Sequence, residues 1–552
     1  MSQDRHTPRE AIRRLTQVGL ALSAEKDHDR VMELILRSAK ELTLADGGTL
    51  YSRTDDDHLK FEIMLTDSLD IVLGGTSGQP INLPPLPLFG EDGTPNNHMV
   101  AVRAANSGKT VNIADAYATD DFDFSGTREF DRRTGYRSKS FLTVPMRNHE
   151  EEIIGVLQLI NARDTETSEV VAFTEEDRDL VESLASQAAI SVTKERLIEA
   201  HQRLFEAFVQ MIATAIDDKS PFTGNHCRRV PELTMMLAEA AVATGEGPLA
   251  DFSMNEDELY ELKIAAWLHD CGKVTTPDSV INKATKLQGL FDRIDMIDSR
   301  IEILKRDAEI SRLRAEVAAL RALPNAEKVS FDSATADRDL ARYQQELEAD
   351  RRFIHEVNHG GEFMSSERQE RVREISARRW QGPGGEQTLL TDNEVHHLTV
   401  KRGTLTQEER QVINNHALIS IKMLEALPYP KNLTRVPEFA GGHHERMDGK
   451  GYPRGLKRED MSIPARIMGI ADIFEALTAR DRPYKKAMNL SQALNILGQL
   501  KLDQHIDPDL FDVFIRERVY ERYAKDFLNP EQVDEFDLQK IPGVPKDIAK
   551  AG

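Results

Sequence analysis

Two adjacent histidines, His443 and His444, begin the run of this chain with the clearest chemical content. Histidine is the commonest metal ligand near neutral pH, so a neighbouring pair suggests a metal site. A polar loop with two glycines follows and ends in Tyr452-Pro453, and it would shape one wall of that site. Distant segments supply the further candidate ligands His226, His269, Asp270, His416 and Asp472.

The candidate ligands favour a transition-metal centre with more than one ion. Asp472 lies in an apolar run, where a carboxylate is costly to bury unless it is paired or binds a metal. Histidine and aspartate together offer nitrogen and oxygen ligands, which suit iron, manganese, zinc or nickel rather than calcium. The candidates outnumber the ligands that one tetrahedral ion needs, so we predict two ions.

Two neighbouring ions predict hydrolysis of a phosphodiester. Ions roughly 3.5–4 Å apart acidify a water molecule and neutralise the phosphate oxygens as charge develops. One aspartate carboxylate can bridge both ions. Lys273 lies about one helical turn beyond His269 and would stabilise the phosphate or the leaving oxygen. Asp270 and Lys273 are therefore the candidate catalytic residues.

Size and charge limit the class of protein. At 552 residues the chain is too long for one core and predicts two to four domains. Its 93 acidic and 71 basic residues give a net charge of −22, which argues against DNA binding. We expect no membrane span, because no apolar run reaches 18 residues. The two cysteines, Cys227 and Cys271, favour a reducing cytoplasm over a disulfide framework.

The first 218 residues predict a sensor-like domain followed by a connecting helix. Residues 10–45 have the apolar spacing of a helix pair, and strand-like runs follow at 48–52, 59–64, 140–146 and 153–160. This order predicts an α+β domain over residues 10–175. Residues 176–218 predict one long helix, capped at its start by Thr174. Parallel pairing of this helix across a homodimer would bury its apolar seam.

The rest of the chain predicts an all-α catalytic domain with a charged insertion. We assign the catalytic domain to residues 219–287 and 401–525, and a C-terminal tail to 526–552. Residues 288–400 predict an inserted coiled-coil hairpin, whose heptad phase shifts after Leu304 as at a stutter. Two interpretations of this hairpin stay open, a solvated charged structure and an arm that binds a partner or dimerises.

The motifs of the C-terminal half resemble the HD superfamily of metal-dependent phosphohydrolases, and in particular its HD-GYP branch. The resemblance covers about residues 205–287 and 401–520, with six separated motifs in the family's order. These motifs are His226, the stretches 269–273 and 277–283, His416, the run 443–456, and Asp472 with 481–485.

The resemblance implies hydrolysis of cyclic di-GMP to pGpG, with further cleavage to GMP left open. It implies two divalent metal ions, iron or manganese, with zinc, nickel or magnesium as alternatives. Phe222 stands where some relatives carry a glutamate for a third metal, so we expect two. The implied substrate contacts are Lys273, Tyr452, Arg482 and Lys485. The implied metal ligands are His226, His269, Asp270, His416, His443, His444 and Asp472.

The N-terminal part resembles a GAF domain of the cyclic-nucleotide phosphodiesterase and adenylyl cyclase type. The resemblance rests on the stretches 115–117, 131–140 and 144–146 and on Asn161, Phe173 and Asp177. Ala162 and Arg178 depart from that family's signature. The domain would bind a small molecule such as a cyclic nucleotide, or would serve only for dimerisation. A diguanylate cyclase with a GGDEF domain is an expected protein partner.

Two classes of function follow. The first is a cyclic di-GMP phosphodiesterase regulated by its GAF domain, or a hydrolase of another cyclic dinucleotide such as cyclic GMP-AMP. The second is a non-catalytic cyclic-dinucleotide receptor or scaffold.

Overall fold

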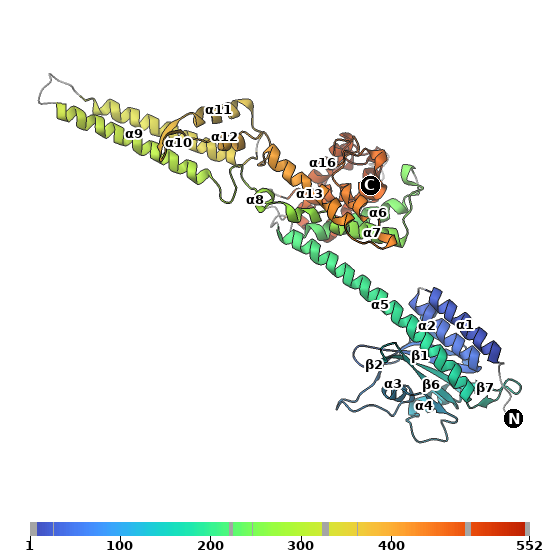
Figure 1. Ribbon diagram of the computed structural model, residues 1–552. Helices are drawn as coiled ribbons and strands as arrows, with labels where there is room; N and C mark the ends of the chain where they lie inside the picture. Colours follow the sequence, from blue (N-terminus) through green and yellow to red (C-terminus); the bar gives the residue numbers. More distant parts are fainter. Residues whose placement is uncertain are drawn as a thin grey trace. The chain divides into compact units, whose positions relative to one another are not determined.

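The computed structural model describes residues 8–25, 27–219, 225–245, 247–322, 331–361, 363–480 and 487–546. The chain divides into two compact units, residues 1–204 and residues 205–552 (Figure 1). The first unit holds a sheet with helices, and the second is largely helical. This confirms the predicted multidomain fold class. None of the described helices combines the length and hydropathy that a membrane span requires.

The first unit is built on an antiparallel sheet in the order β3-β2-β1-β7-β6-β5, with β4 beside β2 and β8 beside β7. The four predicted strands correspond to β1, β2, β6 and β7. The remaining strands are only two to four residues long, too short to give a pattern of alternation. The bounds are β1 Ala45–Arg53, β2 His58–Thr66, β3 Ile71–Gly74, β4 Leu86–Pro87, β5 Val111–Ile113, β6 Phe141–Arg147, β7 Ile153–Arg163 and β8 Val170–Val171.

Helices cover both faces of this sheet (Figure 1). Successive side chains of a strand point to opposite faces, so Leu50 packs with α2 and α5 while Tyr51 packs with α3. The two cores are therefore separated by the sheet itself. The helices are α1 Pro8–Ala24, α2 His28–Thr43, α3 Val100–Ser107, α4 Ser125–Thr134 and the first part of α5 Glu175–Lys219.

Helix α5 is one continuous helix of 45 residues. Its start is a reciprocal cap, in which the amide of Asp177 donates to Thr174 Oγ1 at 3.1 Å and the amide of Thr174 donates to Asp177 Oδ2 at 2.8 Å. Val181, Leu184 and Ala188 are fully buried against the sheet. Further along, Ile190, Leu197 and Leu204 are exposed. Near the end of the helix, Val209, Ala213 and Ile216 are buried in the core of the second unit.

The helices of the second unit enclose one large core (Figure 1). The centre of this core includes the aromatic side chains Phe439, Phe474, Phe511 and Phe514, all fully buried. Residues 528–546, assigned to a tail from sequence, pack onto this core through Ile541. The helices are α6 His226–Ala243, α7 Glu256–Leu268, α8 Asp278–Ile281, α13 Gln407–Glu425, α14 Val436–Gly441, α15 Ile463–Thr478, α16 Leu490–Leu502, α17 Pro508–Arg516 and α18 Val519–Phe527.

The predicted insertion forms a helical hairpin with its own small core. Helices α9 Ile294–Ala322 and α10 Ser333–Asn358 lie side by side (Figure 1). Ile297, Ile301 and Leu347 are fully buried between them. The turn expected at Pro324 and Asn325 lies outside the described residues. Smaller elements complete the hairpin: α11 Ser366–Ser376, α12 Asp392–Leu398, β9 Arg379–Gly382 and β10 Gly385–Thr388.

The two ends of the insertion meet where it joins the helical core. The Lys286 ammonium is buried and donates to the carbonyls of Leu398 and Val400, both at 2.9 Å. Lys283 forms an ion pair with Glu409 at 2.7 Å. These contacts connect chain segments more than 110 residues apart and fix the base of the hairpin.

Candidate metal centre

The structure brings all seven predicted ligands together in the helical unit. His226 is the first residue of α6, and His269 and Asp270 directly follow α7. His416 lies on α13 and Asp472 on α15, and His443 and His444 follow the short helix α14. Two sets of side chains each offer ligand atoms within 4.8 Å of one another. They are His226, His269 and Asp270, and His416, His443 and His444.

The carboxylate of Asp270 lies between the two sets. Its Oδ2 is 3.3 Å from Nε2 of both His226 and His269. Its Oδ1 is 3.1 Å from Nε2 of His416 and 3.9 Å from Nε2 of His443. Each oxygen of one carboxylate thus faces a different pair of histidines, which is the arrangement that a bridge between two ions requires.

Asp472, on helix α15, completes the cluster. Its Oδ1 is 3.3 Å from Nε2 of His226, and its Oδ2 is 3.9 Å from Nδ1 of His444. Burial raises the pKa of this carboxyl, but the neighbouring His226 outweighs burial and holds the pKa well below its usual range. Asp472 is therefore an anion and can act as a ligand at neutral pH.

Five buried polar atoms of the cluster have no hydrogen-bond partner among the described residues. They are Nε2 of His226, His269, His416 and His443, and Oδ1 of Asp270. A buried polar atom without a partner costs free energy, about 1–3 kcal/mol for each group. All five belong to the candidate ligands. The donor set, its burial and these atoms fit divalent metal ions.

Backbone carbonyls fix the tautomer of three of these histidines. Nδ1 of His269 donates to the carbonyl of Ala266 at 2.8 Å. Nδ1 of His416 and of His443 donate in the same way to the carbonyls three residues earlier, both at 2.6 Å. With the proton on Nδ1, the lone pair of Nε2 points into the cluster, as a metal ligand requires.

Burial keeps the adjacent histidines neutral. It lowers the pKa of His444 to about 4 and the pKa of His443 well below its ordinary value. Burial also raises the pKa of Asp270, but the Lys273 ammonium outweighs this and holds that pKa well below its usual range. Neutral imidazoles and ionised carboxylates are the forms that bind metals.

Lys273 contacts the cluster from its rim. It lies in the short 3₁₀ helix Cys271–Thr275, and its ammonium is 2.5 Å from Oδ2 of Asp270. Burial lowers the pKa of the Lys273 ammonium, but the negative charges of Asp270 and Asp472 raise it by more. The pKa therefore lies above its ordinary value, and the side chain is a cation. The lysine thus brings a positive charge to the edge of a cluster with two carboxylates.

Two residues of this site were not predicted from sequence. Glu475 is fully buried and accepts a hydrogen bond from Nδ1 of His226. Arg229 donates to the other oxygen of Glu475 at 2.6 Å. Glu475 follows Asp472 by three residues, so both carboxylates lie on one face of α15. A second carboxylate in this apolar helix was the signal available in the sequence.

The glycine-containing loop is held closed by a buried carboxylate. Glu445 accepts hydrogen bonds from the amides of Arg454 at 2.7 Å, Gly455 at 3.1 Å and Leu456 at 2.9 Å. Tyr452 lies with its ring centroid 4.7 Å from that of His444. The Tyr452–Pro453 peptide bond is cis. This loop therefore forms a wall beside the ligand pair His443 and His444. The predicted substrate contacts Arg482 and Lys485, like Phe222, lie outside the described residues.

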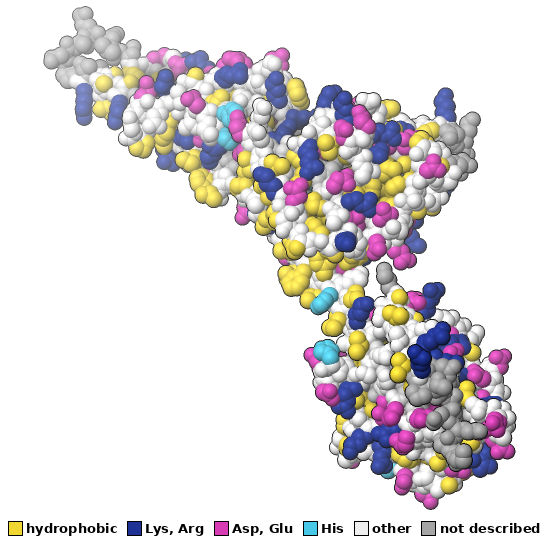
Figure 2. Space-filling model, turned by 45° about the vertical axis from the view of Figure 1, so that its right-hand side comes forward, with side chains coloured by type: hydrophobic (Ala, Val, Ile, Leu, Met, Phe, Trp, Pro, Cys, Tyr) yellow, Lys and Arg dark blue, Asp and Glu magenta, His cyan; other side chains and the backbone are white. Residues whose placement is uncertain are grey.

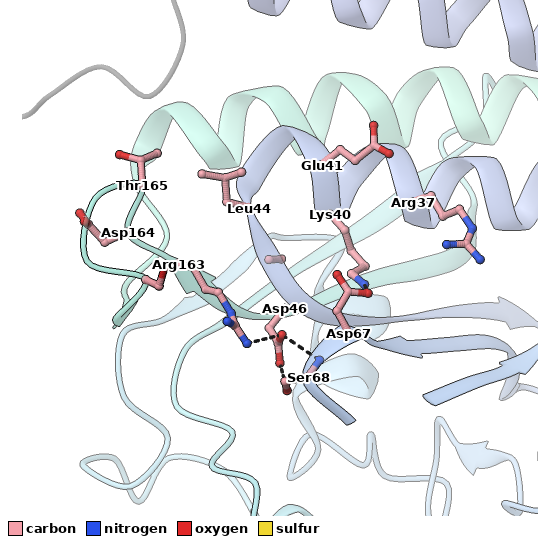
Figure 3. Close-up of a pocket in the computed structure, with 12 residues that line it drawn as sticks. Arg37, Lys40, Glu41, Leu44, Asp46, Asp67, Ser68, Arg163, Asp164 and Thr165 are labelled. Atoms are coloured by element: carbon pink, nitrogen blue, oxygen red, sulfur yellow. Dashed lines mark hydrogen bonds and ion pairs between the residues drawn. The ribbon is translucent and has the colours of Figure 1, made fainter. Parts of the chain in front are cut away.

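The first unit contains a separate polar hollow of about 630 Å³ (Figure 3). At its floor the buried Asp46 accepts from Ser68 Oγ and Tyr136 OH, both at 2.6 Å, and from Arg163 at 2.5 Å. Lys40 forms an ion pair with Asp67 at 2.5 Å. These charged side chains are therefore paired within the protein.

Comparisons with known proteins identify two domains. A GAF domain model matches residues 27–192, and an HD domain model matches residues 391–510, which include four of the candidate ligands. The chain therefore carries a GAF domain and an HD domain. Solved GAF domains align with low similarity. The one from an Acinetobacter phosphoenolpyruvate-protein phosphotransferase is 12% identical, covers 36% of this chain and 99% of that chain, and has a TM-score of 0.26.

Several curated bacterial enzymes are similar over part of the chain. The 3'3'-cGAMP-specific phosphodiesterase 1 of Vibrio cholerae is 39% identical over 128 residues, which are 23% of this chain and 28% of the relative. The cyclic di-GMP phosphodiesterase PA4108 of Pseudomonas aeruginosa is 35% identical over 116 residues, 21% of this chain and 27% of the relative. The matches thus span about a quarter of these relatives' length.

Proposed function

We propose that this chain, which carries a GAF domain and an HD domain, is a metal-dependent phosphodiesterase that hydrolyses cyclic di-GMP. The observation that carries the proposal is the carboxylate of Asp270, whose two oxygens face two different pairs of histidines. Similar regions of relatives named cyclic di-GMP phosphodiesterases support the choice of substrate.

Two divalent ions would share the cluster, iron or manganese in our proposal, with zinc, nickel and magnesium as alternatives. When bound, they would supply an acidified water and neutralise the phosphate oxygens. Asp270 would bridge the ions, with Asp472 as the second carboxylate ligand. His226 and His269 would hold one ion, and His416, His443 and His444 the other.

The chain's own residues would position the substrate. The Lys273 ammonium, at the rim of the cluster, would balance charge on the phosphate or on the leaving oxygen. Tyr452 would flank the substrate from the loop beside His444. Arg482 and Lys485 remain proposed phosphate contacts from the sequence motif alone. We propose pGpG as the product, with further cleavage to GMP as the alternative.

The substitution Asp270→Asn tests this assignment. It removes the bridging charge while keeping the size of the side chain, so both metal content and cyclic di-GMP turnover should fall together. Asp526→Asn, an exposed carboxylate of α18, is the matched control and should change neither. Full turnover and full metal content in the Asp270→Asn protein would overturn the assignment.

A second substrate deserves a parallel assay, because three similar Vibrio cholerae proteins are named 3'3'-cGAMP-specific phosphodiesterases. Purified, metal-loaded protein should be compared on cyclic di-GMP and on cyclic GMP-AMP by kcat/KM. Higher kcat/KM for cyclic GMP-AMP would replace our substrate. Binding of either dinucleotide without turnover would instead favour the receptor or scaffold function.

We further propose a cytoplasmic homodimer that is regulated through α5. Ile190, Leu197, Leu204 and Met211 repeat every seven residues along this helix, and all four are exposed. Parallel pairing of two copies would bury this stripe. A ligand of the GAF domain, or a GGDEF partner protein, would then act on the catalytic unit through this helix. Sedimentation of the purified chain tests the dimer, and loss of dimer in a Leu197→Glu, Leu204→Glu variant is the expected result.

A further inference from the structure

The far half of helix α9 carries an apolar stripe that the hairpin does not use. Ile310, Leu313, Val317 and Leu320 are 43%, 46%, 44% and 59% exposed. Single exposed apolar residues are ordinary, but four in one line mark an interaction surface. Figure 2 shows hydrophobic side chains along this hairpin among charged ones. These four residues carry the shifted heptad phase that follows Leu304 in the predicted coiled-coil hairpin. The structure corrects the expectation that they line its seam, because all four are exposed.

Another face of α9 makes the contact with α10. Lys305 pairs with Glu348 at 2.8 Å, and Arg312 pairs with Asp337 at 2.8 Å. Seven residues separate Lys305 and Arg312, so both lie on one side of the helix, about a third of a turn from the apolar stripe. The shift of heptad phase after Leu304 therefore moves the apolar residues from the hairpin interface to the surface.

The stripe has the spacing of a coiled-coil seam. Its intervals of three, four and three residues place Ile310 and Val317 at a positions and Leu313 and Leu320 at d positions. Isolated helices of two heptads are marginal in water, because forming the first turn is costly. Here α9 is already ordered by its packing on α10, so that cost does not oppose association.

The charges beside the stripe specify the occupant and its direction. The g positions are Glu309 and Glu316, and the e positions are Arg314 and Arg321. In a parallel pair of identical helices, each g residue faces the e residue five positions later on the other helix. Glu309 then meets Arg314 and Glu316 meets Arg321, both with opposite charge. An antiparallel pair would instead place glutamate against glutamate and arginine against arginine.

From this spacing, exposure and charge pattern we infer that the stripe 310–320 of α9 is a parallel docking surface for the same stripe of a second copy of this chain. Glu309 and Arg314 are exposed and form no ion pair with another described residue, so both are available for the contact. Glu316 pairs with Arg312 of its own helix at 2.5 Å and would exchange that partner for Arg321 of the second copy. The inference concerns the inserted hairpin and does not depend on catalysis or on pairing of α5.

Cysteine cross-linking of the full chain tests this docking. In a parallel seam, equivalent d positions come within disulfide distance, so Leu313→Cys should give a covalent dimer under mild oxidation. Ser311→Cys is the matched control. It is exposed on the outer side of the same helix turn and should remain monomeric on a non-reducing gel. The native cysteines Cys227 and Cys271 are buried and do not compete.

Charge reversal tests the direction. Glu309→Arg should lower the cross-linking yield of Leu313→Cys several-fold, because it sets arginine against Arg314. Adding Arg314→Glu should restore the yield.

Equal cross-linking at positions 311 and 313, or none at 313, would overturn the docking. Cross-linking of Ile310→Cys with Leu320→Cys, without any at 313, would overturn the parallel direction. The thiol of the Leu313→Cys protein can also be tested with a soluble maleimide. If this thiol reacts slowly and yet gives no disulfide-linked dimer, the stripe is covered by something other than a second copy of the chain.

Discussion

Glu475 accepts the hydrogen bond of His226 Nδ1 from one helical turn beyond Asp472, and both carboxylates belong to α15. One helix therefore supplies a candidate ligand and also the group that orients another candidate ligand. Arg229 holds the second oxygen of Glu475 at 2.6 Å, so this carboxylate cannot turn away from the histidine.

Glu475→Leu should weaken metal binding about 10–100-fold, because His226 loses the partner that fixes its tautomer. Glu475→Gln is the matched variant and should lose less, since its amide oxygen still accepts from Nδ1. Competition with a chelator of known affinity measures both. Unchanged affinity in the leucine variant would contradict the orienting role of Glu475.

Removal of metal should destabilise the helical unit. Five buried polar atoms of the cluster have no partner among the described residues, and the two carboxylates add negative charge. Bound metal present at 100 times its Kd would stabilise the protein by about 2.7 kcal/mol. Thermal unfolding should therefore show a Tm that rises with metal concentration. The Asp270→Asn protein should show a much smaller rise, and an equal one would argue against metal binding at this cluster.

Lys273→Met should lower kcat by about 10²–10³-fold, the usual effect of removing one group that stabilises developing charge. The methionine keeps most of the side-chain volume but has no charge. Metal content is the second readout and should remain close to that of the unaltered protein. Loss of metal in step with loss of turnover would show that the lysine acts by supporting Asp270 rather than the substrate.

Gly451→Ala should disrupt the loop beside His444. A Cβ at this glycine would lie 2.4 Å from the amide nitrogen of Arg446 and 2.5 Å from Cα of Glu445. Both are backbone atoms, which cannot move aside by a change of rotamer. We expect a lower Tm and reduced turnover. Gly289→Ala is the control, since a Cβ there meets nothing within 4 Å. A normal Tm and normal turnover in the Gly451→Ala protein would contradict the close packing of this loop.

Lys286 should make the stability of the hairpin depend on pH. Burial, with a smaller effect from Arg368, lowers the pKa of its ammonium to about 8. The unfolded chain, with a pKa near 10.4, then binds more protons between pH 8 and 10 than the folded chain. The free energy of unfolding should therefore rise with pH across this window. Lys286→Met should remove that rise in chemical denaturation, and an identical pH slope in both proteins would contradict the prediction.

The sequence by itself determined the main outline of this protein. The short apolar runs around residues 48–52 and 153–160 form strands, and the helical spacing after Thr174 and the heptads from Ile294 to Leu304 form helices. Residue types and their order also indicated a divalent metal centre, because histidine and buried aspartate have few other uses at such density.

Only the tertiary structure decided how these pieces meet. The two oxygens of Asp270 face separate histidine pairs because α6, α13 and the ends of α7 and α14 converge, and no local pattern encodes that convergence. The role of Glu475 depends on His226, 249 residues away in the chain. The stripe from Ile310 to Leu320 has an ideal heptad spacing, yet it lies at the surface. Apolar spacing determines which residues share a helix face, but the packing of neighbouring elements determines whether that face is covered.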